Sequence, residues 1–180
     1  MKVKPFLAAL LVGLTMSSAV VTAHAQTSAR AAGKLSVEER LRRMEDVEAI
    51  RELLVSYGRN FDKRDFAAYS NLFARNGVWV GGADGAQSYE GPAAIRAMVE
   101  KSYQPTVFPG SYHIMSSFEI TLEGPDSAKA WSRWAFVVHG VHSEPVLFRG
   151  GYYEDELVRE DGAWKFKRRR VAADTPTSGR

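Results

Sequence analysis

Two side chains able to take part in proton chemistry stand at the end of a helical pattern. The segment Leu53–Phe73 reads LLVSYGRNFDKRDFAAYSNLF, and Tyr57 lies five residues before Asp62 in it. Tyr57 shares a helix face with Leu54 and Phe61, which is typical of a core face. A solvated surface explains Asp62 alone, whereas a reactive pocket explains the phenol and the carboxylate together. For Tyr57, an ordinary core tyrosine and a donor to an oxygen anion both stay open.

The histidines and the missing cysteines limit the possible chemistry. The chain has four histidines and no cysteine, which excludes disulfides, thiolate metal sites and cysteine nucleophiles. His139 and His142 are three residues apart on one expected strand, so they face opposite sides of it. No H-x-H or H-E-x-x-H pattern occurs. We therefore predict neither a metal site nor another cofactor.

A basic segment, KFKRRR, occupies residues 165–170. Strand alternation places Phe166, Arg168 and Arg170 on one face, which we take as the core side because Trp164 shares it. The other basic residues, Lys165, Lys167 and Arg169, then point to solvent. Arg168 is expected to pair with Asp155 on the neighbouring strand, and Arg170 is left as the candidate that binds a ligand oxygen.

The first 25 residues have the pattern of a secretory signal peptide, with Lys2 and Lys4, an apolar run, and Ala-His-Ala at 23–25. We predict cleavage after Ala25 and a periplasmic or secreted protein; an uncleaved membrane anchor is the alternative. Loss of the two lysines lowers the formal net charge of +3 by two. A mature charge this small, without a recognition motif, argues against nucleic-acid binding. After cleavage no membrane association is expected.

The remaining sequence predicts one domain over residues 36–173, between a flexible leader at 26–35 and a disordered tail at 174–180. S-x-x-E at Ser36 begins a long helix, with an apolar stripe that includes Leu41 and Met44. Asp65 is expected to cap a short helix that ends at Asn76-Gly77, and Gly91-Pro92 opens a third. Short strand 78–80 and strands 112–122, 128–142, 146–159 and 164–172 follow the β pattern. We predict an α+β fold in which two to three N-terminal helices pack on a cone-shaped, curled antiparallel sheet.

Several of these segments together resemble the SnoaL-like group of the nuclear transport factor 2-like superfamily. They are Y-x4-D-x2-D from Tyr57, YEGPAAI at 89–95, His113 at the start of a strand, and G-x-Y-x-D at 151–155 followed by G-x-W-x-F at 162–166. Within that group the pattern is similar to scytalone dehydratase, bile-acid dehydratase and hexachlorocyclohexane dehydrochlorinase. The resemblance implies a cofactor-free lyase or isomerase that acts on a small hydrophobic cyclic or polyketide-like compound.

The same resemblance assigns the roles of three residues. His113 would accept a proton, Asp62 would orient and charge-balance the imidazole, and Tyr57 would stabilise the oxygen anion. The sequence departs from the pattern of these enzymes in two places. The second acidic or histidine partner has no clear match in residues 131–136, and the base of the steroid isomerases, expected near Gly81, is absent.

Aromatic residues complete the expected site. Small-ligand pockets are mostly apolar, so we expect Trp79, Trp134 and Phe136 to line the cavity together with Arg170. Trp131 and Val137 are expected on the outer sheet face, which would be buried in a homodimer. Two further functions stay open: a non-catalytic periplasmic module that binds a small ligand, and a protein-interaction module of the same fold.

Overall fold

The computed structural model describes residues 35–103, 109–140 and 142–174, so the predicted signal peptide lies outside the described residues. These residues fall into two units, of which the first ends at Arg40 and the second begins at Leu41. In the first unit the Ser36 hydroxyl accepts a hydrogen bond from the Glu39 amide at 3.1 Å, as the N-terminal pattern predicts. The second unit contains the sheet and all the sites described below.

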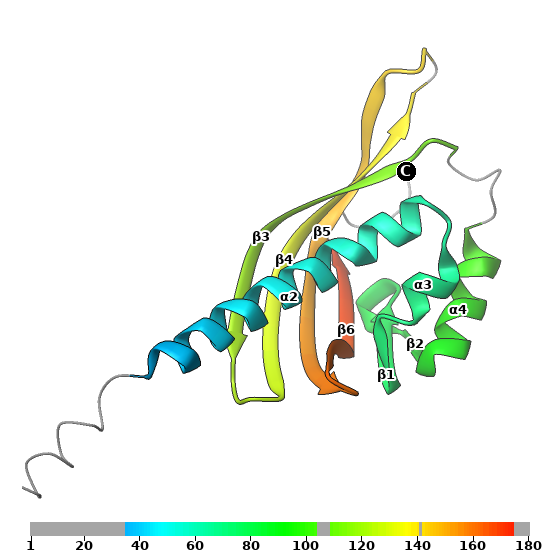
Figure 1. Ribbon diagram of the computed structural model, residues 1–180. Coiled ribbons are helices and arrows are strands. Elements are labelled where there is room, and N and C mark those ends of the chain that lie inside the picture. The colour runs from blue at the N-terminus through cyan, green and yellow to red at the C-terminus, as the bar shows by residue number, and fades with distance from the viewer. Residues whose placement is uncertain (1–34, 104–108, 141, 175–180) are drawn as a thin grey trace, which may run out of the picture. The chain divides into compact units, whose positions relative to one another are not determined.

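The second unit has the predicted α+β arrangement of helices on one face of a curled, unclosed sheet (Figure 1). The helices are α2 (Val37–Asp62), which begins in the first unit, α3 (Phe66–Ser70) and α4 (Gly91–Ser102). A 3-10 turn, η1 (Ala83–Gly85), lies between the first two strands. The strands are β1 (Phe73–Gly81), β2 (Gln87–Glu90), β3 (Tyr112–Leu122), β4 (Ser127–His139), β5 (Pro145–Glu160) and β6 (Ala163–Ala173).

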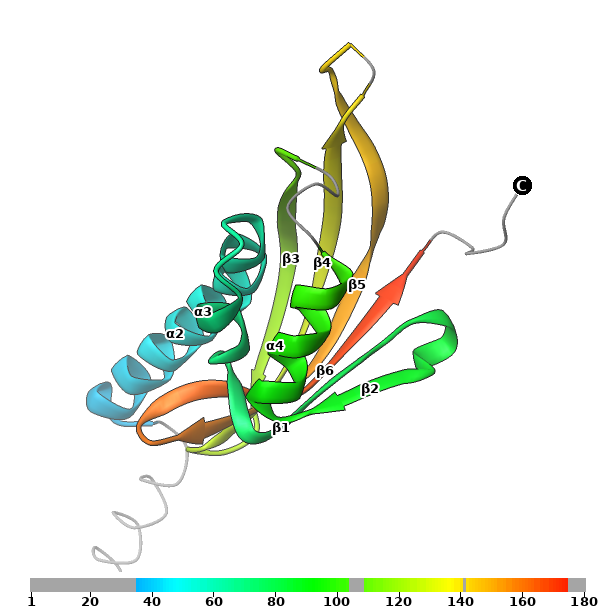
Figure 2. The same ribbon diagram turned by 90° about the vertical axis from the view of Figure 1, so that its right-hand side faces the viewer.

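The sheet has six strands in the order β2-β1-β6-β5-β4-β3. All neighbouring pairs are antiparallel except β1 and β6, which run parallel. The strands from β3 to β6 pair consecutively and antiparallel, as a meander. Figure 2 shows that the end of β4 and the start of β5 run past the start of β3.

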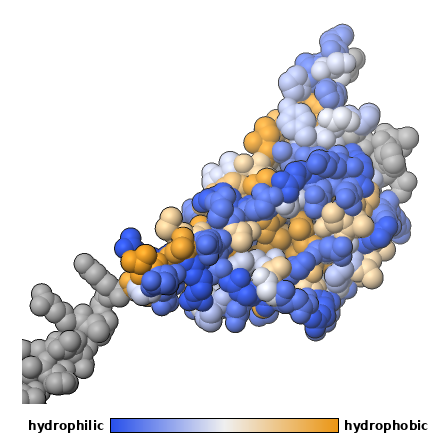
Figure 3. All heavy atoms as spheres, viewed as in Figure 1, coloured by the Kyte–Doolittle hydropathy of each residue, from blue (hydrophilic) through white to orange (hydrophobic). Residues whose placement is uncertain are grey.

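The core lies between α2 and the sheet. The buried stripe of α2 includes Ile50, Leu54, Tyr57 and Phe61, as the sequence pattern indicates. Leu41 and Met44 do not belong to it, because they are 54% and 69% exposed. In Figure 3 hydrophilic residues gather along the outward side of this helix.

Local signals set the ends of the shorter helices. The Asp65 carboxylate accepts a hydrogen bond from the Ala68 amide at 2.9 Å and caps α3. Asn76-Gly77 does not end this helix, because both residues lie within β1, at an irregularity in its pairing with β6. Among the described residues, no helix combines the length and apolar character needed to cross a membrane.

Candidate functional site

The C-terminal end of α2 meets the start of β3 through one carboxylate. Asp62 Oδ1 lies 2.7 Å from His113 Nδ1, and Asp62 Oδ2 accepts a hydrogen bond from the His113 amide at 2.8 Å. The two side chains are 20% and 10% exposed, respectively. A carboxylate on Nδ1 stabilises the tautomer with its proton on that nitrogen, so Nε2 is left able to accept a proton.

The helix can approach the strand this closely because residue 58 is glycine. A Cβ at Gly58 would lie 3.0 Å from the Cβ of His113, closer than side-chain carbons normally approach. The rings of Phe61 and Phe136 lie against the imidazole, with centroids 5.0 and 4.8 Å away. Backbone contact and aromatic packing therefore hold the imidazole in one orientation.

Asp62 and His113, called the dyad from here on, border an opening of about 310 Å³. Its walls come from the outward side of α2 and from β3, and its lining residues are Val55, Arg59, Asp62, Lys63, His113 and Met115. None of the other predicted site residues, Tyr57, Trp79, Trp134, Phe136 and Arg170, lines this opening.

Tyr57 lies deeper, in the core of the second unit, and is only 4% exposed. Its hydroxyl accepts a hydrogen bond from Trp79 Nε1 at 2.9 Å and shares a second hydrogen bond with the hydroxyl of Tyr69. Burial raises the pKa of the Tyr57 phenol, while the charge of Arg169 and these two hydrogen bonds lower it. The expected position at the mouth of the apolar face is therefore not observed.

The three predicted aromatic residues lie in different surroundings. Trp79 is partly buried and joins Tyr57, and Trp134 stacks on Tyr153 with ring centroids 5.8 Å apart. Only Phe136 touches the dyad, through its ring contact with His113. The structure thus brings together Asp62, His113 and Phe136, and it places Tyr57 and Trp79 together in a separate cluster.

The predicted faces of the last strand are wrong beyond Phe166. In the pairing of β5 with β6, Leu157 faces Phe166, but the preceding residue Glu156 faces Arg168. Lys167 is therefore an extra residue, and this β-bulge reverses the alternation after it. Arg169, expected in solvent, is completely buried, whereas Arg170 is partly exposed and pairs with Glu154 at 2.8 Å.

Arg169 takes the partner that was expected for Arg168. Its Nε and Nη2 donate to the two oxygens of Asp155 at 2.8 and 2.7 Å, and neither side chain is exposed. The guanidinium carbon lies 4.0–4.1 Å from the ring centroids of Tyr57, Tyr153 and Phe166. Burial raises the pKa of the Asp155 carboxyl, and the Arg169 charge offsets part of that rise. Three consecutive arginines, at 168–170, could each pair with Asp155 as far as the sequence indicates. The bulge at Lys167 determines that Arg169 is the one that does.

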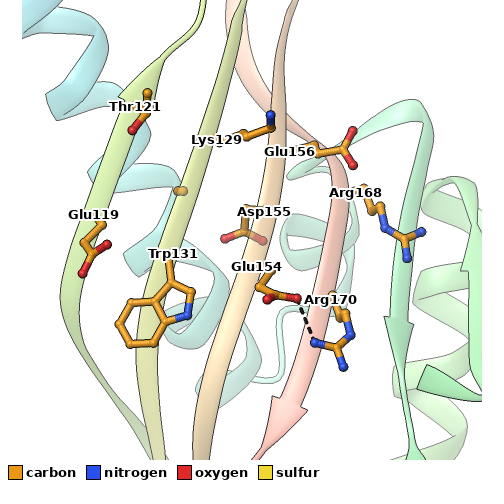
Figure 4. A pocket seen from close by; sticks show the side chains of 10 residues that line it. Glu119, Thr121, Lys129, Trp131, Glu154, Asp155, Glu156, Arg168 and Arg170 are labelled. Carbon is orange, nitrogen blue, oxygen red and sulfur yellow. Dashed lines mark hydrogen bonds and ion pairs between the residues drawn. The ribbon is translucent and has the colours of Figure 1, made fainter. Parts of the chain in front are cut away.

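The outer face of the sheet carries a second hollow, of about 510 Å³. Figure 4 shows Trp131, Glu154 and Arg170 on neighbouring strands of this face, together with Arg168 and Glu119 at its two sides. Arg170 thus faces away from the dyad, and its expected place in the inner cavity is a wrong prediction. Trp131 lies on the outer face, as predicted.

Among residues 35–103, 109–140 and 142–174, no three histidine, aspartate or glutamate side chains gather as a metal site would need.

Comparison with known proteins gives the family. The model of the SnoaL-like domain matches residues 42–170. A nuclear transport factor 2-like protein with a cystatin-like fold from Novosphingobium aromaticivorans is 27% identical, with a TM-score of 0.69 over 81% of this chain and 95% of that one. No curated protein matches the sequence.

Two other solved structures share the fold. A scytalone dehydratase described as putative, from the same species, is 22% identical with a TM-score of 0.65, over 74% of this chain and 87% of that one. A hexachlorocyclohexane dehydrochlorinase from Novosphingobium barchaimii is 20% identical with a TM-score of 0.65, over 76% and 91%. The family match covers most of the chain, including Asp62 and His113, and this protein belongs to the SnoaL-like family.

Proposed function

We propose that this protein is a cofactor-free lyase or isomerase with His113 as its general base. The observation that carries the proposal is the 2.7 Å contact between Asp62 and His113 at the edge of an opening. A histidine that borders an opening, with a carboxylate on one of its ring nitrogens, suits removal of a proton next to a carbonyl. The fold shared with a dehydrochlorinase and a dehydratase-like protein is consistent with this chemistry.

In the proposed reaction His113 Nε2 takes a proton from a carbon next to a carbonyl group. The electrons of the C–H bond form a C=C bond, and those of the carbonyl π bond move to its oxygen. Asp62 stays ionised and holds the imidazolium through Nδ1–H. As a lyase, the enolate re-forms the carbonyl and expels a β-hydroxyl group, which takes the imidazolium proton and leaves as water, or a halide ion, with that proton lost to solvent. As an isomerase, it takes the imidazolium proton at another carbon.

Tyr57 is the proposed donor to the enolate oxygen. Its oxygen already accepts a hydrogen bond from Trp79, so its O–H can donate either to the Tyr69 hydroxyl or to a ligand. Its 4% exposure means that a ligand reaches it only if neighbouring rings move. We therefore expect Tyr57 to contribute less than the dyad.

The substrate would be a small hydrophobic cyclic or polyketide-like compound. Aromatic rings surround the imidazole, namely Phe61 and Phe136, and Tyr103 packs on Phe61 with centroids 4.6 Å apart. Rings of this kind favour an apolar, flat ligand.

Exchange of carbon-bound hydrogen tests the base without knowledge of the substrate. A panel of cyclic ketones and β-hydroxy ketones is incubated with the protein in D2O and followed by NMR. The wild type should catalyse exchange or water loss for members of the panel, and His113→Ala should lose this activity while keeping its circular dichroism spectrum. A His113→Ala variant with full activity would rule out the mechanism.

The alternative is a module of the same fold without catalysis, either a small-ligand binder or a protein-interaction module. It is favoured by the aromatic side chains that fill the space around Tyr57, where Tyr69, Phe73 and Phe166 are all buried. A binder would retain an apolar compound through purification and show no exchange with any member of the panel. An interaction module would do neither.

The outer face is the proposed contact with a second copy of the chain. Ile114 and Leu147 are exposed there, at cross-strand positions next to Ala135 and Val137. Light scattering should give twice the mass of one chain, and Leu147→Glu should shift it to the monomer.

We also propose that the chain is exported and cut after Ala25, which the N-terminal sequence of the protein isolated from its host would test.

A further inference from the structure

A row of three paired residues across β3, β4 and β5 places the Arg149 side chain on the same face of the sheet as His113. Phe136 of β4 lies directly opposite His113 of β3 on one side and Arg149 of β5 on the other. Residues directly opposite each other on neighbouring strands project from the same face of a sheet. The Arg149 side chain therefore leaves the sheet on the side of His113 and Phe136, although it is two strands from the imidazole.

A β-bulge beside this row adds an aromatic ring. Phe136 pairs with Arg149 and the next residue, Val137, pairs with Leu147, so Phe148 is the extra residue of β5. The Phe148 ring lies edge-on to Phe136 at 6.4 Å, and the Arg149 guanidinium lies 5.8 Å from its centroid. Bulges often redirect side chains next to functional sites. Here the bulge brings Phe148 against the ring that touches His113, and the Arg149 guanidinium lies against Phe148 in turn.

The Arg149 charge has no counter-charge in the described chain. Among the aspartates and glutamates whose side chains the structure describes, none forms an ion pair with it. Most other arginines of the strands have such a partner, among them Arg159, Arg169 and Arg170. Arg149 is thus available to an anion from outside the chain.

A second cation and a phenol approach the same place from the helices. Arg64 follows α2, stacks on Phe61 at 5.3 Å and donates to the Ser111 hydroxyl at 3.3 Å. Tyr103 follows α4 and packs on the same Phe61 ring. Burial raises the pKa of the Tyr103 phenol, and the charges of Arg149 and Arg64 both lower it, which reflects how near both guanidinium groups are.

We propose that Arg149, with Arg64 and Tyr103, binds an anionic oxygen group of the ligand whose other end meets His113. This inference rests on the proposed function and names its substrate class: cyclic compounds that carry a carboxylate. Two strand spacings put Arg149 about 10 Å from His113, measured between backbones. A molecule of one or two fused rings could cover Phe136 and reach both. Guanidinium groups bind carboxylates through paired, charged hydrogen bonds.

Binding of two matched probes tests the anion subsite without any turnover. The probes are 2-naphthoate and its neutral analogue 2-naphthamide, titrated into the full-length protein by calorimetry at pH 7. The wild type should bind the carboxylate about tenfold more tightly, as expected for one charged hydrogen bond of about 1.5 kcal/mol. Arg149→Gln should remove this preference, and Arg149→Lys should restore part of it.

The control is Arg133→Gln, an exposed arginine of the outer face that stacks on Trp131 and pairs with Asp174. It should leave the preference unchanged. Equal binding of both probes to the wild type, no binding of either, or a preference that survives Arg149→Gln would each overturn the proposal.

The variant His113→Ala separates this inference from the proposed function. It should lose hydrogen exchange but keep its preference for 2-naphthoate. If the preference depends on Arg149 while no compound undergoes exchange, the subsite stands and the enzymatic proposal fails. If exchange depends on His113 and Arg149→Gln changes nothing in the binding of the two probes, the subsite fails and the enzymatic proposal stands.

Discussion

Two pairs of a carboxylate and a cationic or basic side chain lie on the helix side of this sheet, and their surroundings differ. Asp62 and His113 border an opening, while Asp155 and Arg169 are fully enclosed by the rings of Tyr57, Tyr153 and Phe166. The shortest contact is 2.7 Å in both. A pair that reaches an opening can exchange a proton with a ligand, whereas an enclosed pair can only stabilise or destabilise the fold.

The enclosed pair should show the largest effect on stability. Asp155→Asn leaves the Arg169 charge without compensation in the core, so we expect a loss of about 4 kcal/mol in the free energy of unfolding. Urea denaturation followed by tryptophan fluorescence measures it. The matched control is Glu154→Gln on the same strand, whose partner Arg170 is exposed, and which should cost less than about 1 kcal/mol.

A double variant sharpens this result. Asp155→Leu combined with Arg169→Met removes both charges, and it should be more stable than Asp155→Asn, because no uncompensated charge remains. A double variant less stable than the single one would show that the pair itself, rather than the neutralisation of a buried charge, holds the core together.

The open pair should show the next largest effect, on rate rather than on stability. Asp62→Asn keeps the side-chain size but removes the charge that stabilises the imidazolium. We expect the hydrogen-exchange rate of a reactive ketone to fall by about 10²-fold, within the range typical of general-base catalysis. NMR in D2O measures the rate. Asp65→Asn, three residues on and still able to cap α3, should leave it unchanged.

The contrast between the two pairs also separates what the sequence predicts from what it does not. Asp62 and His113 could be paired in advance because a resemblance names both and each lies at an element boundary that local signals fix. The Asp65 cap and the Pro92 helix start are set by a few neighbouring residues in the same way.

Arg169 could not be placed in advance, because its orientation depends on one extra residue, Lys167, that appears only in the pairing of β6 with the preceding strand β5. The alternation of Trp164 and Phe166 is correct up to the bulge and reversed after it. The prediction that Leu41 and Met44 are buried is wrong for a related reason. Their spacing indicates a buried stripe, but burial requires another element to pack against. The stripe is buried only from the region of Asp46 onward.

Tyr57 contacts the enclosed pair and is also proposed to act with the open pair. Its replacement should therefore lower both the stability and the exchange rate, each by less than the variants above. Its ring covers Arg169, and its hydroxyl is the proposed donor to the enolate. Tyr57→Phe should slow exchange about tenfold, below the value for a fully preorganised donor, and should cost about 1 kcal/mol of stability. Trp79→Phe removes only the hydrogen bond to this hydroxyl, so it should reproduce the stability loss without the loss of rate. An unchanged rate in Tyr57→Phe would assign the phenol to the enclosed region alone.

A second buried carboxylate, that of Asp46, extends the comparison to the dependence of stability on pH. Burial raises the pKa of this carboxyl, but hydrogen bonds from Arg159 and Trp164 and the Arg159 charge outweigh burial and leave the pKa below its ordinary value. A lowered pKa means that the unfolded chain binds a proton first as the pH falls. The stability that Asp46 contributes is therefore complete above the ordinary carboxyl pKa of about 4 and is lost below it.

The measurement is the difference in the free energy of unfolding between the wild type and Asp46→Asn. We expect about 1 kcal/mol at pH 7, narrowing as the pH falls from about 5 to 3. Asp126→Asn removes the exposed partner of the same Arg159 and should show a smaller, flatter difference. If the gap for Asp46→Asn widened in acid, the sign of its pKa shift would be reversed, and Arg159 would not compensate Asp46 as Arg169 compensates Asp155.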